Sequence, residues 1–173
     1  MELFDLYDSC RRPTGETMVR GTPVPTDRYR LVVHVCIFND KGELLIQQRQ
    51  PFKKGWSNLW DISVGGAVVA GETSQQGAHR ELLEELGLDI DFSGKVPAFT
   101  TTFESGFDDI YIRNMEIELS QLRLQPEEVQ TAAWATKAQI LTMIEEQTFI
   151  PYSKVFVEYL FFRRNHTGNF ESD

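Results

Sequence analysis

The segment from Gly66 to Leu88 constrains this chain more than any other part of it. It reads Gly66, five residues, Glu72, seven residues, and then the run Arg80-Glu81-Leu82-Leu83-Glu84-Glu85-Leu86-Gly87-Leu88. Because an α-helix advances about 100° per residue, Glu81, Glu84 and Glu85 share one arc of roughly 100°. Ala78 and the leucines of the run lie mostly on the other side. The spacing predicts a helix with a carboxylate face and an apolar face.

Three carboxylates on one helix face repel one another unless a positive charge lies among them. A hard divalent cation, Mg²⁺ or Mn²⁺, suits carboxylate and water ligands. Acidic clusters on helices are more often solvated surface, and Glu84 and Glu85 alone would be read that way. The choice between solvated surface and a metal site therefore depends on whether the whole segment, with Gly66, Glu72 and Arg80, matches a known metal-binding pattern.

The residues that flank this segment predict where the helix begins and ends. Thr73 or Ser74 is the expected N-cap, and Gln76 stands where a capping box places its second residue. Gly87 is expected to end the helix in a left-handed conformation. The glycine-rich loop ahead of the helix lets the backbone approach a ligand closely, and it sets a carbonyl, most simply that of Gly66, beside the carboxylate face.

Taken together, the segment from Gly66 to Leu88 resembles the signature box of the Nudix hydrolases at every specified position. The resemblance implies a metal-dependent enzyme that cleaves a diphosphate linkage. It also implies that the metal ligands are the Gly66 carbonyl, Glu81, Glu84 and Glu85. It implies that Arg80 supports catalysis by holding the glutamates through salt bridges. It also implies the Nudix fold, an α/β (α+β) arrangement in which a mixed β-sheet is sandwiched between α-helices.

A second resemblance extends from residue 29 to about 145. The segments Tyr29–Phe38, Leu44–Arg49 and Lys53–Trp56, with Trp60, are similar to isopentenyl diphosphate isomerase, which has the Nudix fold. The isomerases carry a catalytic cysteine, a glycine and a histidine where this chain has Gly65-Gly66-Ala67. They also break the Nudix box, which is intact here. The pattern therefore resembles the bacterial isomerase-like Nudix hydrolases, and hydrolysis is favoured over isomerisation or over a binding module without catalysis.

Substrate contacts are expected outside the box. Arg49 and Lys53 match positions at which the isomerases contact diphosphate, and Arg and Lys both suit phosphate oxygens. A surface-exposed basic pair is the competing interpretation. Most aromatic residues are expected in the core, but Phe52 or Tyr111 is expected to touch the ligand.

The general base has several candidates. Glu81 and Glu84 lie within the box. Outside it, Asp108 and Asp109 are expected in a loop before a strand that begins at Ile110, about where the isomerases place an acidic catalytic residue. Of these two aspartates Asp109 is the preferred candidate, and Glu104 and Glu116 are weaker choices.

Composition bounds the partners and the compartment. A chain of 173 residues fits one domain, and its formal charge of −9 disfavours a nucleic-acid polymer as partner. A metal centre can still receive a small-molecule diphosphate on an acidic protein. Cys10 and Cys36 are too few for a disulfide framework, and there is neither an N-terminal apolar leader nor an apolar run of membrane length. We expect a cytoplasmic protein with no membrane partner.

The rest of the chain predicts strands and helices around the box. Strands are expected at Arg30–Phe38, Glu43–Gln48, Trp60–Val64, Val96–Phe103, Ile110–Leu119 and Glu128–Trp134, and helices at Lys137–Glu146 and from Pro151 to about Arg164. Residues 28–165 form the expected Nudix domain, and residues 166–173 a disordered tail. Residues 1–27 form an extension packed on this core, either as an extra strand or as a docking element for a second subunit, which leaves a homodimer open.

Overall fold

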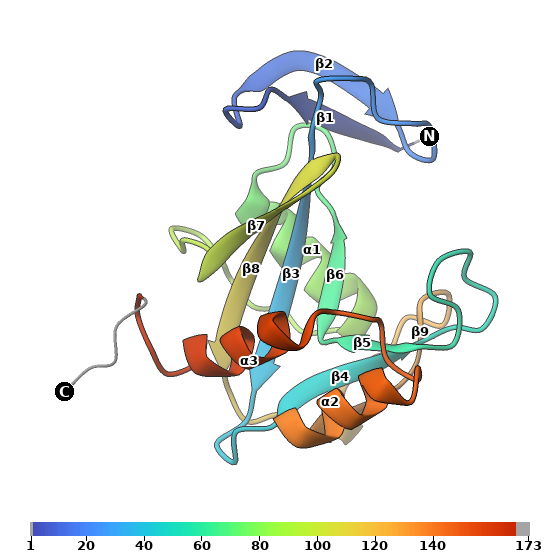
Figure 1. Ribbon diagram of the computed structural model, residues 1–173, viewed down its shortest axis with the longest axis vertical. Coiled ribbons are helices and arrows are strands. Elements are labelled where there is room, and N and C mark those ends of the chain that lie inside the picture. The colour runs from blue at the N-terminus through green and yellow to red at the C-terminus, as the bar shows by residue number, and fades with distance from the viewer. Residues whose placement is uncertain (1, 169–173) are drawn as a thin grey trace.

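A seven-stranded mixed sheet forms the centre of the fold (Figure 1). The structure is a computed structural model that describes residues 2–168. The strands are β3 (Arg30–Phe38), β4 (Leu44–Arg49), β5 (Trp60–Ile62), β6 (Val64–Ala67), β7 (Phe99–Phe103), β8 (Gly106–Asn114) and β9 (Val129–Ala135). Their order is β5-β4-β3-β8-β7, with β6 paired to β3 and β9 paired to β4. The pair β3 and β8 is parallel, and the other pairs are antiparallel.

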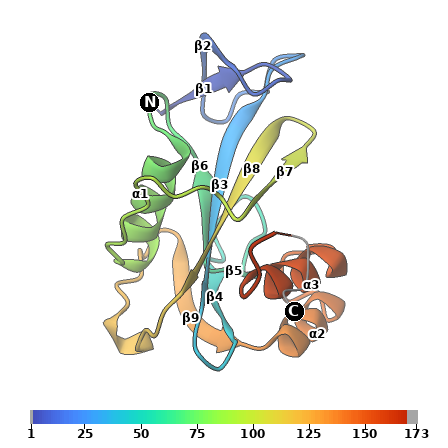
Figure 2. The ribbon, with the colours of Figure 1, turned by 90° about the vertical axis from the view of Figure 1, so that its left-hand side faces the viewer.

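Helices cover both faces of this sheet (Figure 2). Helix α1 (Ser74–Leu86) packs on one face, while α2 (Lys137–Glu145) and α3 (Lys154–Arg163) pack on the other. Alternate residues of β3 supply both cores, with Val33 facing Leu82 of α1 and Cys36 facing Leu160 of α3. The expected mixed sheet between helices is confirmed.

Several strand boundaries differ from the expectation; β7 begins three residues later than expected, at Phe99, and the two largest differences concern β5–β6 and β8. The single strand expected at Trp60–Val64 is divided into β5 and β6 at Ser63, whose buried hydroxyl donates to the Leu45 carbonyl (2.6 Å) and accepts from the Ile37 amide (2.9 Å). The strand expected at Ile110–Leu119 begins instead at Gly106 and ends at Asn114. Leu119 begins a 3₁₀ turn, Leu119–Gln121. The polar residues at the start of β8 have the composition of a loop, and the partners of Asp108 and Asp109, His34 and Arg11, are distant in the sequence.

The N-terminal extension is a separate two-stranded sheet, drawn at the top of Figure 1. It consists of β1 (Leu3–Tyr7), which matches the expected extra strand, and β2 (Pro13–Val19), which was not expected because its sequence is mostly polar. Backbone hydrogen bonds join Tyr7 to Tyr29 and the Ala70 amide to the Leu3 carbonyl (2.8 Å). The apolar residues Phe4, Leu6 and Met18 pack against Ala67 and Val69.

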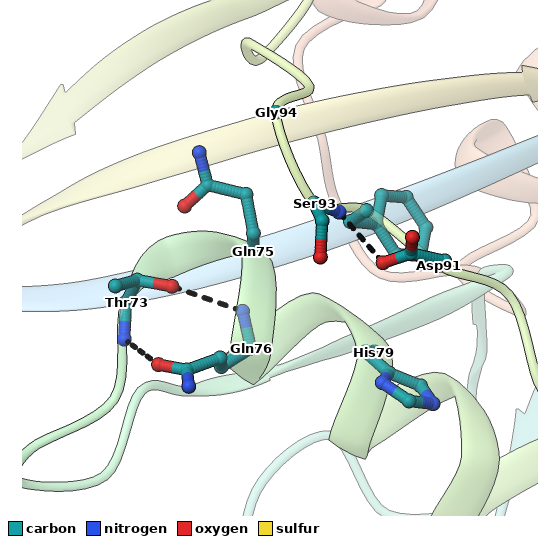
Figure 3. Close-up of a pocket in the computed structure, with 8 residues that line it drawn as sticks. Thr73, Gln75, Gln76, His79, Asp91, Ser93 and Gly94 are labelled. Atoms are coloured by element: carbon teal, nitrogen blue, oxygen red, sulfur yellow. Dashed lines mark hydrogen bonds between the residues drawn. The ribbon is translucent and has the colours of Figure 1, made fainter.

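Helix α1 begins and ends where the sequence predicted. The Thr73 hydroxyl accepts from the Gln76 amide (3.3 Å) and the Gln76 side chain accepts from the Thr73 amide (2.8 Å), which completes the capping box (Figure 3). Gly87 ends the helix with φ of 71°, in the left-handed region. The helix is thus fixed at both ends by local contacts.

The C-terminal end of the described chain stays close to α3. His166 stacks on Phe162 with a ring-centroid distance of 4.2 Å. Of the tail expected at residues 166–173, residues 169–173 lie outside the described residues. Within residues 2–168, none of the helices combines the length and hydropathy that crossing a bilayer requires.

Candidate active site

A cavity of about 180 Å³ lies between the carboxylate face of α1 and the strand β6. Most of the site residues predicted from the sequence line this cavity. Four further lining residues, Glu2, Arg20, Gln125 and Glu128, were not predicted. Its lining consists of Glu2, Arg20, Arg49, Lys53, Gly65, Gly66, Ala67, Arg80, Glu81, Glu84, Glu85, Gln125 and Glu128. We call it the catalytic cavity.

Gly66 brings the backbone of β6 directly against a carboxylate of α1. It pairs with Val33 in the sheet, so its position is fixed by β3. A Cβ at Gly66 would overlap the carboxylate of Glu81. Only glycine permits this approach, which places the backbone next to the carboxylate face as the sequence predicted.

Arg80 joins the carboxylates of this site to one another. Its guanidinium donates to Glu72 (2.8 Å), Glu81 (2.8 Å) and Glu84 (3.2 Å), and to the carbonyl of Ala67 (3.0 Å). Burial raises the pKa of Glu81, while Arg80 acts in the opposite direction and lowers it. Arg80 therefore tethers the start of the box, the glycine loop and the helix together.

Glu85 is the most buried carboxylate of the cavity, with 5% of the residue exposed. Burial and the neighbouring Glu81 raise the pKa of Glu85 to about 8. The Gln47 amide donates to Glu85 (2.8 Å), and the buried Gln47 Oε1 has no partner among the described residues. A buried acceptor without a donor and a carboxylate that favours its protonated form both indicate that a positive or proton-donating species belongs here.

The donor set suits a hard divalent cation such as Mg²⁺ or Mn²⁺. It combines the carboxylates of Glu81, Glu84 and Glu85 with the backbone of Gly66. Over residues 2–168, no three or more His, Cys, Asp or Glu side chains are gathered closely enough to form a closed metal site. The ion pairs from Arg80 to Glu81 and Glu84 hold two of the carboxylates toward the guanidinium. Side-chain rotation of these glutamates would accompany metal binding.

Basic side chains also line the catalytic cavity, and we call Arg20, Arg49 and Lys53 its basic wall. Lys53 pairs with Glu128 (2.5 Å), and Arg49 lies 3.9 Å from Asp61. Both Arg49 and Lys53 line the cavity, as the resemblance implied for phosphate contacts. Arg20 of the extension adds a third cation. The cavity therefore holds these cations beside the box carboxylates, and Glu2 and Glu128 of the same lining pair with Arg20 and Lys53.

Two predicted site residues lie elsewhere. Asp109 was expected in a loop, but it lies within β8 and is fully buried on the α1 side of the sheet. Its carboxylate pairs with Arg11 and accepts from Ser74 (2.6 Å) and Thr100 (2.6 Å). Tyr111 is also buried, with its hydroxyl 2.9 Å from that of Ser74. Neither residue lines the catalytic cavity, so the geometry gives no support to Asp109 as the base or to Tyr111 as a substrate contact.

The other aromatic candidate and the neighbour of Asp109 have different surroundings. Phe52 is 67% exposed and does not line the cavity. Asp108 faces the opposite side of β8 from Asp109, where its carboxylate lies 2.8 Å from His34 Nδ1. Burial lowers the pKa of His34, but the Asp108 carboxylate outweighs this effect and the pKa is raised overall. The His34 ring lies directly against Gly65, which lines the cavity.

Sequence reasoning missed Arg20, Gln47 and Glu128 as parts of this site. Glu128 was expected at the start of a strand, but only the pairing of β4 with β9 brings it beside Lys53. Gln47 lies on a strand whose side-chain alternation could have marked it as facing the box helix. Nothing in the sequence points to Arg20, because the fold of the extension decides where it lies.

A second hollow, of about 370 Å³, is separate from this site (Figure 3). It lies between the first turns of α1 and the loop at residues 91–94, and polar side chains including Gln75 and His79 line it. None of the carboxylates of the catalytic cavity contributes to it. The carboxylates that suit a metal ion therefore line the catalytic cavity and not this hollow.

Comparison with known proteins gives matches over nearly the whole chain. The NUDIX domain family matches residues 28–164. A protein of Listeria monocytogenes named as an uncharacterised Nudix hydrolase is 47% identical over 167 residues, which are 96% of this chain and 98% of that protein. An isopentenyl-diphosphate Delta-isomerase of Pectobacterium atrosepticum is 34% identical over 104 residues, which are 60% of this chain and 56% of that protein. A crystal structure of a protein from Deinococcus radiodurans has a TM-score of 0.77 at 26% identity and covers 92% of this chain and 99% of its own.

Proposed function

The chain belongs to the NUDIX domain family and is a Nudix hydrolase, and from this premise we propose its reaction. It is a Mg²⁺- or Mn²⁺-dependent pyrophosphohydrolase that cleaves a diphosphate linkage in a nucleoside diphosphate derivative or a related organic diphosphate. One observation carries the proposal, namely that a single cavity is lined both by the box carboxylates and by Arg49 and Lys53. The carboxylates suit a metal, and the basic wall suits phosphate oxygens.

The box residues that line the cavity have different parts in this reaction. Glu81, Glu84, Glu85 and the Gly66 carbonyl would hold the metal, which when bound neutralises phosphate oxygens and lowers the pKa of a coordinated water. Arg80 keeps the carboxylates oriented through its ion pairs. Glu84, whose side chain is 49% exposed, would accept the proton of the attacking water.

The basic wall binds and orients the substrate. Arg49 presents a planar fork of donors to phosphate oxygens, and Lys53 provides a point charge. In the structure Lys53 is bound to Glu128, so a phosphate would exchange one anionic partner for another. The ligand contact predicted for Phe52 stays a prediction. Its ring is exposed and could meet only a part of the ligand that lies outside the cavity.

One observation favours a second activity. The loop Gly65-Gly66-Ala67 carries no thiol or imidazole, but the structure brings His34 against Gly65 from the adjacent strand β3. With Asp108 beside it, this imidazole holds a proton close to the position where the isomerases carry their cysteine. Proton transfer to an isopentenyl diphosphate is therefore the second candidate, and incubation with that compound followed by detection of dimethylallyl diphosphate tests it.

The hydrolase proposal is tested by release of phosphate or nucleoside monophosphate across a panel of organic diphosphates, with and without EDTA. The panel contains nucleoside diphosphate sugars, dinucleotides, ADP-ribose, coenzyme A and nucleoside triphosphates. Glu84→Gln and Glu85→Gln are expected to abolish turnover while the circular dichroism spectrum is preserved. Glu158→Gln, which makes the same change at an exposed position of α3, is the matched control. Wild-type kcat in either box variant at saturating Mg²⁺ would disprove the metal-site assignment.

We also propose a cytoplasmic location. Both cysteines are free, with Cys10 exposed and Cys36 buried. Unpaired thiols are typical of a reducing compartment. Fractionation of the producing cell, with detection of the full-length chain, tests this location.

A further inference from the structure

Another cavity, of about 540 Å³ and distinct from the hollow in Figure 3, adjoins the catalytic cavity. The two share Arg20 and Ala67 in their linings, so they open next to each other. Phe4 and Met18 of the β1–β2 hairpin form apolar parts of the wall, and Arg30 at the start of β3 contributes a second guanidinium. We call it the extension cavity, because most of its lining comes from residues before β3 (Figure 1).

Arg30 is a cation without an anion in this cavity. Among the described residues, no carboxylate forms an ion pair with its guanidinium, which lies over the Phe103 ring at 5.5 Å from the centroid. Burial lowers the pKa of Arg30, and the nearby charge of Arg20 lowers it further. A partly buried guanidinium beside a second cation is electrostatically unfavourable unless an anion joins them.

Arg20 connects the two cavities. In the structure its guanidinium donates to Glu2 (2.6 Å), and 63% of its side chain is exposed. The exposed side chain of Arg20 has room to exchange Glu2 for an anionic ligand. A substrate whose diphosphate occupies the catalytic cavity would extend past Ala67 and place its next group between Arg20 and Arg30.

We propose that the extension cavity binds a phosphate group carried by the substrate beyond the scissile diphosphate, held by Arg20 and Arg30. The identity of this ligand as part of the substrate rests on the proposed function. Two guanidinium groups suit the several oxygens of a phosphate, and the apolar side chains of Phe4 and Met18 suit the carbon skeleton that carries it. The N-terminal hairpin is then a specificity element that selects substrates with an additional phosphate.

The first test separates this site from catalysis. Inorganic phosphate is titrated into the whole protein in EDTA by isothermal calorimetry, since without metal the carboxylates of the catalytic cavity repel anions. Saturable binding is expected, and Arg20→Gln and Arg30→Gln should each weaken it by at least about tenfold. Arg28→Gln is the matched control, because Arg28 directly follows the extension, pairs with Glu16 of β2 (2.5 Å) and lines neither cavity.

Further variants keep the test decisive. Arg30→Lys retains the charge and is expected to bind phosphate more weakly than wild type but more tightly than Arg30→Gln, which also covers the case in which the Gln variant does not fold. Acetate, titrated in parallel, should bind at least about tenfold more weakly than phosphate. Phosphate affinity that does not change in the Arg20 and Arg30 variants, or acetate affinity equal to that of phosphate, would overturn the proposal. Loss of hydrolysis with intact arginine-dependent phosphate binding would instead refute the proposed function alone.

Discussion

Replacing Glu85 by Gln tests the electrostatics of the catalytic cavity in the metal-free protein. The substitution keeps the size of the side chain and an acceptor for the Gln47 amide, which donates to Glu85 at 2.8 Å. It removes a carboxylate whose pKa is raised from its usual 4.5 to about 8 by burial and by Glu81. We expect the variant to lose metal-dependent activity and yet to be more stable than the wild type at alkaline pH.

The magnitude follows from the pKa of Glu85. Between pH 4.5 and about 8 the folded metal-free protein binds more protons at Glu85 than the unfolded chain does, so its free energy of unfolding falls as pH rises through this window. Each pKa unit corresponds to about 1.36 kcal/mol, which gives a loss of up to about 5 kcal/mol at pH 9. At pH 5 the carboxyl is protonated in the folded state and resembles the Gln side chain, so most of this difference should be absent.

Urea unfolding in EDTA at pH 5 and at pH 9 measures both differences. The wild type should lose stability relative to Glu85→Gln between the two pH values, and added Mg²⁺ should restore stability to the wild type alone. Glu84→Gln is the matched control on the same helix, because its carboxylate is half exposed and its loss should change stability little. A stability difference between wild type and Glu85→Gln that stays the same at both pH values would refute the reasoning.

Two further predictions concern packing. Gly66→Ala places a Cβ into the Glu81 carboxylate, so we expect kcat/KM to fall by about 100-fold or more, as for other small misplacements at an active site, while Gly55→Ala, which meets open space, keeps the activity. Steady-state kinetics at saturating Mg²⁺ measure this, and equal activity of the two variants would contradict the close approach. Leu82→Ala should reduce the free energy of unfolding by about 2–5 kcal/mol, because Leu82 is fully buried under the sheet. Leu83→Ala, on the exposed side, should reduce the free energy of unfolding by less than about 1 kcal/mol when measured by urea unfolding. Equal reductions in the two variants would contradict the assignment of Leu82 to the buried face of α1.

The parts of the fold that depend on local contacts were predictable from the sequence. Helix α1 has its N-cap at Thr73 and its left-handed end at Gly87, both of which are set by residues within a few positions. The strand β3 was predicted to the residue, because a nine-residue apolar run bounded by a turn leaves little choice. The carboxylate face follows from the helical repeat and so was predictable as well.

The parts that depend on distant partners were not predictable. Asp109 is accommodated inside a strand because Arg11 of the extension, Ser74 of α1 and Thr100 of β7 satisfy its carboxylate. In the sequence the same aspartate has the polarity of a loop residue. Arg20 reaches the catalytic cavity through the β1–β2 hairpin, and no periodicity records where a hairpin rests on another sheet.

The parallel pairing of β3 with β8 also bears on the order in which the protein folds. His34 and Asp108, which meet across this pair, are 74 residues apart in the sequence. The box helix ends at Leu86 and β8 begins only at Gly106, so a nascent chain can hold the whole box while one edge of β3 is still unpaired. Closing so long a loop is slow compared with forming a helix or a hairpin. A metal ion that binds only the assembled cavity would therefore report on a late step of folding.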